Sequence, residues 1–318
     1  MIEGFDIAIV GAGISGLLAA RRLRDHYGMR VVILEKSFGV GGRMASRFDG
    51  HARFDHGAQY FTAREERFRA LVDDWLGLGL IKNWRSSEDD FPRYVGHPSI
   101  TSVAHFLAEE LDLHQNQMVI SAQREDRNWL LKTESGTQLR AACLLLTPPV
   151  PQALGILDAG GAALTDADNT FLRSIQYAKC IALLGRLDGP SNLVAPGMLK
   201  FDHPEPITWI GDNQQKGVSG APSITIHSGP EFAERYFDKG SEELKTVLFN
   251  TARPFIRANL LDWMIHRWRY ALRLTEHDRE YFADPKRQLW MAGDGFSAPR
   301  IEGAAMSGLA VADAIAQC

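Results

Sequence analysis

The chain has 318 residues, of which 45% are hydrophobic, and a formal net charge of −4 at pH 7. This length allows two domains, and the hydrophobic content is that of an ordinary globular protein. The negative net charge gives no general attraction to nucleic acid or to an anionic membrane, so we expect neither as a partner.

The cysteines Cys143, Cys180 and Cys318 are scattered along the chain. Their odd number and wide spacing predict neither a disulfide framework nor a metal site, and they favour a cytoplasmic location. The sequence contains no run of about 20 apolar residues, so it predicts no membrane-spanning helix.

The first 35 residues have the pattern of a strand, a helix and a second strand. Residues 5–10 and 31–34 are apolar runs, and residues 14–27 have helical periodicity. Glycines spaced G-x-G-x-x-G join the first strand to the helix, and an acid ends the second strand. These features together form a complete βαβ fingerprint for binding a dinucleotide.

Each position of the fingerprint has a physical task. Gly11 allows the tight turn, Gly13 lets a pyrophosphate approach the backbone, and Gly16 lets the helix pack against the strands. The helix N-terminus offers N–H groups to the phosphates, and Glu35 can accept hydrogen bonds from a ribose diol. The expected nucleotide contacts here are Gly11, Ala12, Gly13, Ser15, Gly16 and Glu35.

Three further stretches carry cofactor motifs. Residues 36–43 read K-S-F-G-V-G-G-R, residues 54–61 read F-D-H-G-A-Q-Y-F, and residues 290–315 begin W-M-A-G-D-G-F. In this order they resemble the second glycine motif, the segment beneath the flavin ring and the closing flavin motif of the FAD-dependent amine oxidase superfamily. The resemblance implies FAD as the cofactor, whereas the fingerprint alone does not separate FAD from NAD.

The pattern of elements changes after residue 149. Before it, the sequence predicts helices at 65–80 and 99–113, a loop or short strand at 83–98, and strands at 118–120, 129–133 and 142–147. After it come strands at 181–187, 208–211 and 223–227, and helices at 231–237 and 242–258. A strand at 289–292 and a helix at 303–317 return the chain to the cofactor domain.

These elements predict an α/β protein of two domains. The first is a discontinuous Rossmann-like FAD-binding domain, residues 1–85, 99–150 and 285–318. The second is an α+β substrate domain with a mixed or antiparallel sheet, residues 86–98 and 151–284.

The superfamily resemblance implies more contacts with FAD. Arg43 would bind a cofactor phosphate, unless it is a surface arginine. Val119 would present backbone groups to the adenine, unless it belongs to an ordinary sheet strand. Asp294 would bond the ribityl chain or reach the pyrophosphate through water, and the helix opening at 301–304 would stabilise negative charge on the reduced flavin. The implied residues are Lys36, Gly42, Arg43, Gln59, Tyr60, Val119, Gly293, Asp294, Ile301 and Ala304.

The closing flavin motif contains no cysteine before the last residue of the chain. A thioether to the flavin is therefore not expected, and the FAD is predicted to be noncovalent.

Motifs in the middle of the chain distinguish between families within the superfamily better than the flavin motifs do. Residues 211–216 (G-D-N-Q-Q-K), 224–227 (I-T-I-H) and 268–270 (W-R-Y) resemble the renalases of the bacterial type, a family within the superfamily. Renalases oxidise dihydronicotinamide isomers that carry the hydride at ring position 2 or 6. They transfer it to flavin N5, release NAD(P)⁺ and reduce molecular oxygen to hydrogen peroxide. The substrate-pocket candidates are Gln59, Tyr60, Asn213, His227, Trp268 and Tyr270, and no side chain is assigned a catalytic acid or base role.

Two other functions stay open at this point. One is a flavin amine oxidase acting on a small amine, which would share every flavin motif. The other is a flavoprotein that binds FAD for structure or sensing without rapid turnover. His227 could face the substrate or be structural, and the basic–aromatic run 266–270 could contact a dinucleotide or form a strand with one solvated face. The sequence leaves open the oligomeric state and the preference for NAD or NADP.

Overall fold

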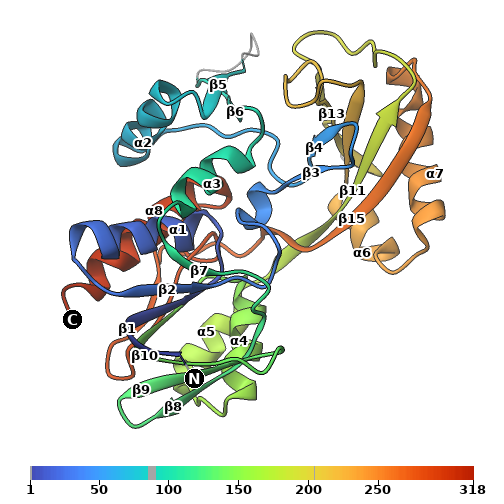
Figure 1. The fold of residues 1–318 in the computed structure, drawn as a ribbon. Coiled ribbons are helices and arrows are strands. Elements are labelled where there is room, and N and C mark those ends of the chain that lie inside the picture. Colours follow the sequence, from blue (N-terminus) through green and yellow to red (C-terminus); the bar gives the residue numbers. More distant parts are fainter. Residues whose placement is uncertain (1, 85–90, 204) are drawn as a thin grey trace. The chain divides into compact units, whose positions relative to one another are not determined.

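The computed structural model describes residues 2–84, 91–203 and 205–318, and the chain forms two compact units (Figure 1). Unit 1 consists of Met1–Gly42, Ala104–Gln176 and Arg273–Cys318, and unit 2 consists of Arg43–Val103 and Tyr177–Leu272. Residues 85–90 lie outside the described residues. Residues 86–90 were expected in the substrate domain, and residue 85 was expected to end the first segment of the FAD-binding domain.

The boundaries of these units differ from the expected domain boundaries. Residues 43–84 and 99–103, expected in the FAD-binding domain, belong to unit 2. Phe54 explains part of this difference, because it packs with Ala182 and Leu184 of the second sheet. Residues 151–176 and 273–284, expected in the substrate domain, belong to unit 1, where a helix beginning at Val150 packs on the first sheet.

Unit 1 is built on an eight-stranded sheet in the order β16-β17-β10-β1-β2-β7, extended through β10 by β9 and then β8. Strands β17, β10, β1, β2 and β7 run parallel, while β16, β9 and β8 pair antiparallel. The strands are β1 (Ile2–Val10), β2 (Val31–Leu34), β7 (Asp112–His114), β8 (Val119–Glu125), β9 (Asn128–Thr133), β10 (Gln138–Leu146), β16 (Phe282–Asp284) and β17 (Leu289–Met291). The apolar runs read from the sequence therefore form the buried parallel centre of this sheet.

Helices pack on this sheet and on one another. Helix α1 continues into a π-helical turn, Arg22–His26, and it packs against α8. The approach is close at Gly308, where an added Cβ would lie 2.3 Å from the carbonyl oxygen of Ser15. The helices are α1 (Ile14–Arg21), α4 (Val150–Ala159), α5 (Asp166–Ser174), α8 (Arg300–Ile315) and α3 (Thr101–Ala108), which crosses the boundary between the units.

Unit 2 contains a five-stranded sheet in the order β12-β13-β14-β11-β15 and two short hairpins. The pairs β12–β13, β13–β14 and β11–β14 are antiparallel, as the predicted fold class requires. The strands are β11 (Tyr177–Leu187), β12 (Met198–Lys200), β13 (Ile207–Asp212), β14 (Ser223–Ser228) and β15 (Leu260–Arg273), with hairpins β3 (Ser46–Phe48)–β4 (Arg53–Asp55) and β5 (Ile81–Asn83)–β6 (Tyr94–Gly96). The helices are α2 (Glu66–Gly77), α6 (Pro230–Tyr236) and α7 (Ser241–Ala252), and short 3₁₀ turns occupy Gly42–Met44 and Arg253–Phe255.

The two-residue period of β11 divides its apolar side chains between two cores. Ile181 and Leu183 lie in a cluster with residues of α6 and α7, whereas Ala182 and Leu184 lie in a cluster with Ala52 and Phe54. The second of these clusters places the segment around β4 against the sheet, and that segment carries the sequence motif 54–61.

Two predicted helices end earlier than expected. The helix expected at 99–113 ends at Ala108, because Glu110 has φ of +60° and Asp112–His114 then pairs with β2. The helix expected at 242–258 ends at Ala252, where a 3₁₀ turn, Arg253–Phe255, contains Pro254 and replaces continued α-helix.

Candidate functional site

The turn between β1 and α1 has the geometry expected of a nucleotide cradle. Gly11 has φ of +102°, a backbone conformation that favours glycine. A Cβ at Gly16 would lie 2.2 Å from the Gly11 carbonyl oxygen, whereas a Cβ at Gly13 would have no atom within 4 Å. Gly16 is thus needed for packing, and the backbone at Gly13 is open to a ligand.

Glu35 is buried at the end of β2, and its carboxylate binds two backbone groups. Oε2 accepts a hydrogen bond from the N–H of Ala12 at 2.8 Å, and Oε1 accepts one from the N–H of Ser37 at 2.8 Å. Each oxygen keeps a lone pair for a further donor such as a ribose hydroxyl. The carboxylate therefore fixes the glycine turn as well as offering an acceptor.

The second glycine motif lies directly on the first. The N–H of Gly41 donates to the carbonyl oxygen of Ala12 at 2.8 Å, and Gly41 forms a parallel bridge with Gly13. Ser15, in the first turn of α1, has a buried hydroxyl oxygen without a hydrogen-bond partner. A phosphate oxygen at the helix N-terminus would satisfy it, so the residues present fit a dinucleotide such as FAD.

The closing motif lies at the end of β17, beside these residues. Ala292 donates its N–H to the Leu146 carbonyl at 3.0 Å, and Gly293, with φ of +133°, donates its N–H to Ser307 Oγ at 2.9 Å. Asp294 is buried, and Ile301 and Ala304 are buried in the first turns of α8.

The remaining cofactor candidates are more dispersed. Val119 is buried and pairs with Thr133 in the sheet, while Lys36 and Gly42 are exposed. Arg43 belongs to unit 2, where its Nη1 donates to the carbonyl oxygen of Tyr270 at 3.2 Å. The roles assigned to these residues and to the closing motif in binding FAD stay predictions.

In unit 2, Gln59 and side chains from the strands β14 and β15 hold the backbone carbonyls of the segment 55–57, which begins at the end of β4. The Asp55 carbonyl accepts hydrogen bonds from Gln59 Nε2 at 2.7 Å and from Thr225 Oγ1 at 3.0 Å. The His56 carbonyl lies 2.9 Å from Trp268 Nε1 and 3.2 Å from His227 Nε2. This segment is therefore tied to β14 and β15 at successive residues.

Four of the six predicted pocket residues thus gather around one segment. Besides Gln59, His227 and Trp268, Asn213 joins through its Nδ2, which donates to Thr225 Oγ1 at 3.1 Å. The Asn213 Oδ1 atom is buried without a hydrogen-bond partner, so this amide oxygen beside Thr225 has no donor.

The two tyrosines among the candidates lie in other surroundings within unit 2. Tyr60 packs beside Trp84 and Trp209, with ring centroids 6.0 and 5.6 Å away, and Arg93 lies over its ring at 4.7 Å. Tyr270 meets Tyr177 edge to face at 5.7 Å.

Three histidines of this region are neutral at pH 7. Burial lowers the pKa of His56 to about 3, and it lowers the pKa values of His227 and His266 to about 4. A carbonyl oxygen only accepts hydrogen bonds, so the proton of neutral His227 resides on Nε2, facing the His56 carbonyl. Nδ1 of His227 is then an acceptor.

The sequence did not identify a buried ion pair beneath this segment. Lys216 Nζ lies 3.0 Å from Asp55 Oδ2, and it also donates to the Gln59 side-chain oxygen at 3.2 Å. Both residues stand inside the motifs quoted from the sequence. No local pattern indicates that this lysine is buried, because lysines are almost always exposed.

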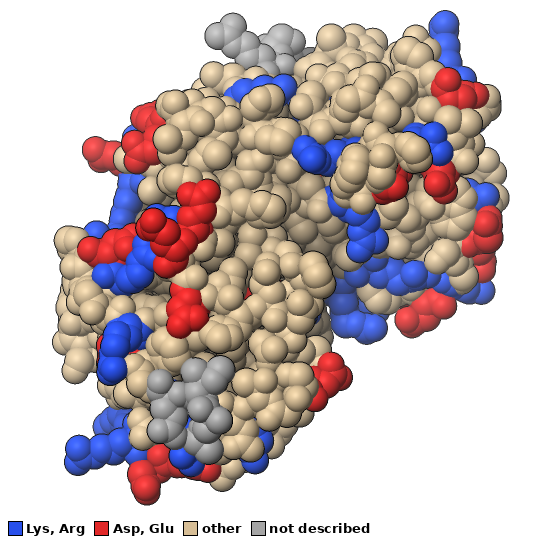
Figure 2. Space-filling model, viewed as in Figure 1, with Lys and Arg blue, Asp and Glu red and all other residues tan. Residues whose placement is uncertain are grey.

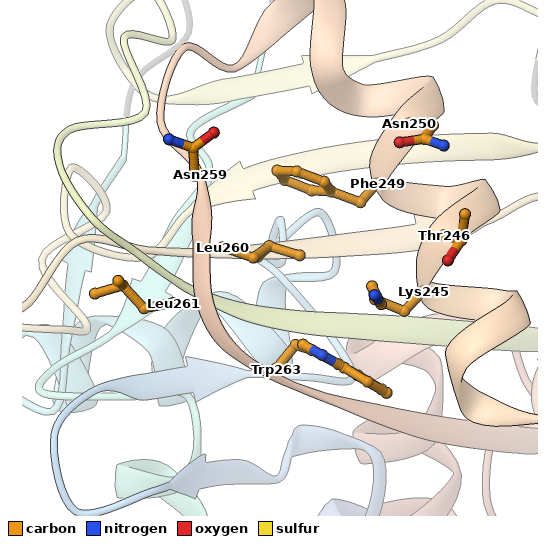
Figure 3. A pocket seen from close by; sticks show the side chains of 8 residues that line it. All are labelled: Lys245, Thr246, Phe249, Asn250, Asn259, Leu260, Leu261 and Trp263. Atoms are coloured by element: carbon orange, nitrogen blue, oxygen red, sulfur yellow. The ribbon is translucent and has the colours of Figure 1, made fainter.

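A hollow in unit 2 lies apart from these residues (Figure 3). It has a volume of about 420 Å³ between α7 and the start of β15, and none of the predicted site residues lines it. Its lysine, Lys245, pairs with Glu242 at 2.9 Å and lies over the Trp263 ring at 5.3 Å. We assign no ligand to this hollow. It is lined by Lys245, Thr246, Phe249, Asn250, Asn259, Leu260, Leu261 and Trp263.

Three further observations concern the surface and the described chain as a whole. Basic and acidic side chains are interspersed on the face shown in Figure 2. Among the described residues, no group of three or more His, Cys, Asp and Glu side chains could hold a metal ion. In the same part of the chain, no helix combines the length and the apolar character needed to cross a membrane.

Comparison with known proteins agrees with this organisation. Residues 9–75 match the family model described as an NAD(P)-binding Rossmann-like domain. The chain is 21% identical to renalase from Mus musculus, over 96% of this chain and 97% of the mouse protein.

Solved structures share the fold at lower sequence identity. Cyclohexylamine oxidase from Brevibacterium oxydans IH-35A superimposes with a TM-score of 0.78 at 14% identity, covering 98% of this chain and 99% of its own. The CLA-producing fatty acid isomerase from P. acnes gives 0.75 at 13% identity, covering 98% of each chain. One fold therefore serves oxidases and an isomerase, and fold alone does not determine the reaction.

The predicted fold class and the resemblance to renalase are both confirmed. The chain is similar to renalase along nearly its whole length, shares the fold of cyclohexylamine oxidase, and matches a Rossmann-like domain over residues 9–75.

Proposed function

We propose that this protein is an FAD-dependent oxidase of dihydronicotinamide isomers. Its substrates would be 2- and 6-dihydro-NAD(P), its products NAD(P)⁺ and hydrogen peroxide, and its electron acceptor molecular oxygen. The observation that carries the proposal is the similarity to renalase, which extends over 96% of the chain and so includes unit 2 as well as the nucleotide cradle.

Unit 1 supplies the groups that would hold the cofactor. The open backbone at Gly13, the unpartnered hydroxyl of Ser15 and the N-terminus of α1 suit a pyrophosphate. Glu35 suits a ribose diol. When bound, FAD would supply the hydride acceptor and the route for electrons to oxygen.

Unit 2 supplies a rigid set of polar groups that suits a nicotinamide. Hydride transfer needs alignment of donor and acceptor more than it needs an acid or a base. The segment 55–57 is fixed by four side chains, and neutral His227 offers Nδ1 as an acceptor for the N–H of a carboxamide. Neutral histidines support a positioning role over proton transfer at pH 7.

Anaerobic stopped-flow reduction of the bound flavin tests the proposal. The donors are 2-dihydro-NAD, 6-dihydro-NAD, ordinary 4-dihydro NADH and cyclohexylamine. A displacement of about 1 Å from the reactive geometry costs about 100-fold in rate, so the 2- and 6-isomers should reduce the flavin about 100 times faster than NADH. Equal rates with NADH would contradict the proposal.

A small-amine oxidase is the second candidate, favoured by the likeness in fold to cyclohexylamine oxidase. Reduction by cyclohexylamine at a rate that matches the isomers would establish this reading instead. If no donor bleaches the flavin, a binding or sensing flavoprotein would be the better description.

A further inference from the structure

Arg273 is a buried cation without a countercharge. It ends β15, belongs to unit 1, and its side chain is only 8% exposed. Among the residues that the structure describes, no ion pair includes it, and its Nε is buried without a hydrogen-bond partner. A buried charge normally has a partner, because the loss of hydration is costly.

The contact between Arg273 and His277 does not provide that partner. Arg273 Nη1 lies 3.0 Å from His277 Nε2, but the same nitrogen lies 2.7 Å from the carbonyl oxygen of Gly295. The backbone N–H of Arg279 donates to the other ring nitrogen, Nδ1, at 3.3 Å. Burial lowers the pKa of His277, and the charge of Arg273 lowers it further.

A neutral imidazole carries one proton. Since Nδ1 accepts from Arg279, the proton is on Nε2 and points to Gly295. Nε2 then has no lone pair for Arg273. The guanidinium therefore has at least two N–H groups, at Nε and Nη1, that no protein acceptor satisfies.

The cluster of Arg273, His277 and Gly295 lies near the ligand-binding edge of the first sheet. Gly295 follows β17, which runs parallel to β10 and β1, so the carboxyl ends of these strands share one edge. Ser307 connects the segments, since its Oγ accepts from the Gly293 N–H and donates to the Glu280 carbonyl at 2.6 Å. Ligands of open α/β sheets bind outside this edge.

We propose that the Arg273 guanidinium binds an anionic oxygen of the flavin nucleotide. This rests on the proposed function in that FAD is the ligand. Two parts of FAD supply such an oxygen: the pyrophosphate, and the N1–C2=O edge of the reduced flavin ring. The guanidinium fork suits either, because it presents parallel N–H donors to neighbouring oxygens. His277 positions the backbone of Gly295 and leaves the guanidinium free for the ligand.

The test compares Arg273→Met with Arg279→Met as the matched control. Arg279 is an exposed arginine a few residues away, lying 3.9 Å over the ring of Phe171. FAD affinity is measured by flavin fluorescence on the refolded or dialysed apoprotein, ADP affinity by calorimetry, and the midpoint potential of the bound flavin by reductive titration.

A charge-assisted hydrogen bond to a buried ligand corresponds to about 10- to 100-fold in affinity. If Arg273 binds the pyrophosphate, Arg273→Met should weaken FAD and ADP by the same factor. If Arg273 binds the reduced ring, ADP affinity should be unchanged and the midpoint potential should fall, because the reduced anion loses its partner. Arg279→Met should change none of these values.

Two further measurements keep the test decisive. The stability of apo Arg273→Met to urea should equal or exceed that of wild type, because an uncompensated buried charge has been removed. Should this variant fail to fold, Arg273→Lys, which keeps the charge and loses the fork, should still weaken FAD or lower the potential. If the Arg273 variants keep the wild-type FAD affinity and midpoint potential, this inference is wrong, while the proposed function is unaffected. Failure of the wild-type protein to bind FAD would overturn the proposed function together with it.

Discussion

Lys216 Nζ lies 3.0 Å from Asp55 Oδ2, with the two side chains 1% and 0% exposed. The lysine follows β13 and the aspartate ends β4, so the pair joins two distant stretches of unit 2. Lys216 also contacts Gln59, whose amide holds the Asp55 and Gly57 carbonyls at 2.7 and 3.1 Å. The ion pair therefore supports the segment on which four predicted pocket residues converge.

Lys216→Met should destabilise the protein by about 3–5 kcal/mol, because it leaves the Asp55 carboxylate buried without its partner. Urea denaturation at neutral pH measures the loss. The control is Lys239→Met, which removes an exposed pair with Glu243 at 3.6 Å and should cost less than about 1 kcal/mol.

The double variant Asp55→Asn/Lys216→Met should recover part of the loss, since no unpaired charge then remains buried. If Lys216→Met costs no more than Lys239→Met, the ion pair does not hold this segment.

The contrast between this pair and the glycine turn shows what a single sequence can reveal. Gly11, Gly16 and Glu35 were predicted because their tasks follow from spacing within one βαβ unit. The structure shows the tight turn at Gly11 and the close packing at Gly16, while the contact of Glu35 with a ribose stays a prediction. Asp55 and Lys216 meet only through the tertiary fold. Each is individually a common surface residue, so neither periodicity nor composition indicates their burial.

Whether a segment forms a helix or a strand was also easier to predict than the unit to which it belongs. Most of the longer strands of both sheets were read from apolar runs, which are a local signal, whereas the short strands β7, β12 and β16 were not predicted. Helix α4 was not predicted, because Pro151 and Gly155 obscure its pattern. Residues 151–176 were expected in the substrate domain, and the structure places them in unit 1.

Glu35→Ala should lower both FAD occupancy and stability. The alanine leaves the N–H groups of Ala12 and Ser37 without an acceptor, at a cost of about 1–3 kcal/mol each where they stay buried. The sequence alone assigned Glu35 to a ribose diol and gave it no role in stability. Glu35→Gln keeps one acceptor oxygen and should lose less stability while still binding less FAD. The flavin-to-protein ratio and urea denaturation of the apoprotein separate the two effects; an unchanged ratio in both variants would remove Glu35 from the site.

Stability should fall as the pH is lowered below about 6.5. His56 has a folded pKa of about 3 against 6.5 in the unfolded chain, so the unfolded state takes up a proton first. This histidine contributes its full stability above the unfolded pKa and loses it as the pH falls towards the folded value, by up to about 1.4 kcal/mol per pH unit. His227 and His266 act in the same direction down to pH about 4.

Urea denaturation between about pH 7 and pH 5 measures this dependence. His56→Gln should make it shallower, whereas His51→Gln, which alters an exposed histidine of the same unit, should not. A pH dependence that is identical in all three proteins would show that His56 is not held neutral.

The flavin should leave the protein intact when the chain is denatured with acid. Burial raises the pKa values of Cys143 and Cys180 to about 12, so neither thiol is a ready nucleophile, and Cys318 is the last residue of the chain. Chromatography of the supernatant after precipitation identifies FAD. Yellow colour retained in the washed precipitate would show a covalent bond.

Trp268→Phe should slow flavin reduction more than it weakens FAD binding. The indole N–H donates to the His56 carbonyl at 2.9 Å, and phenylalanine keeps an aromatic ring while removing that donor. The stability loss should be about 0.5–1.5 kcal/mol, because His227 still holds the same carbonyl. The segment 55–57 then gains freedom. If it lies beneath the flavin as the superfamily resemblance implies, a small displacement there should reduce the rate about 10-fold or more.

Trp263→Phe, which changes a tryptophan of the α7–β15 hollow on the same strand, should leave the rate unchanged. Stopped-flow reduction at saturating substrate, together with the FAD dissociation constant, distinguishes the two effects. A Trp268→Phe protein that loses FAD but reduces its remaining flavin at the wild-type rate would place this carbonyl in the cofactor-binding framework, away from the reacting ring.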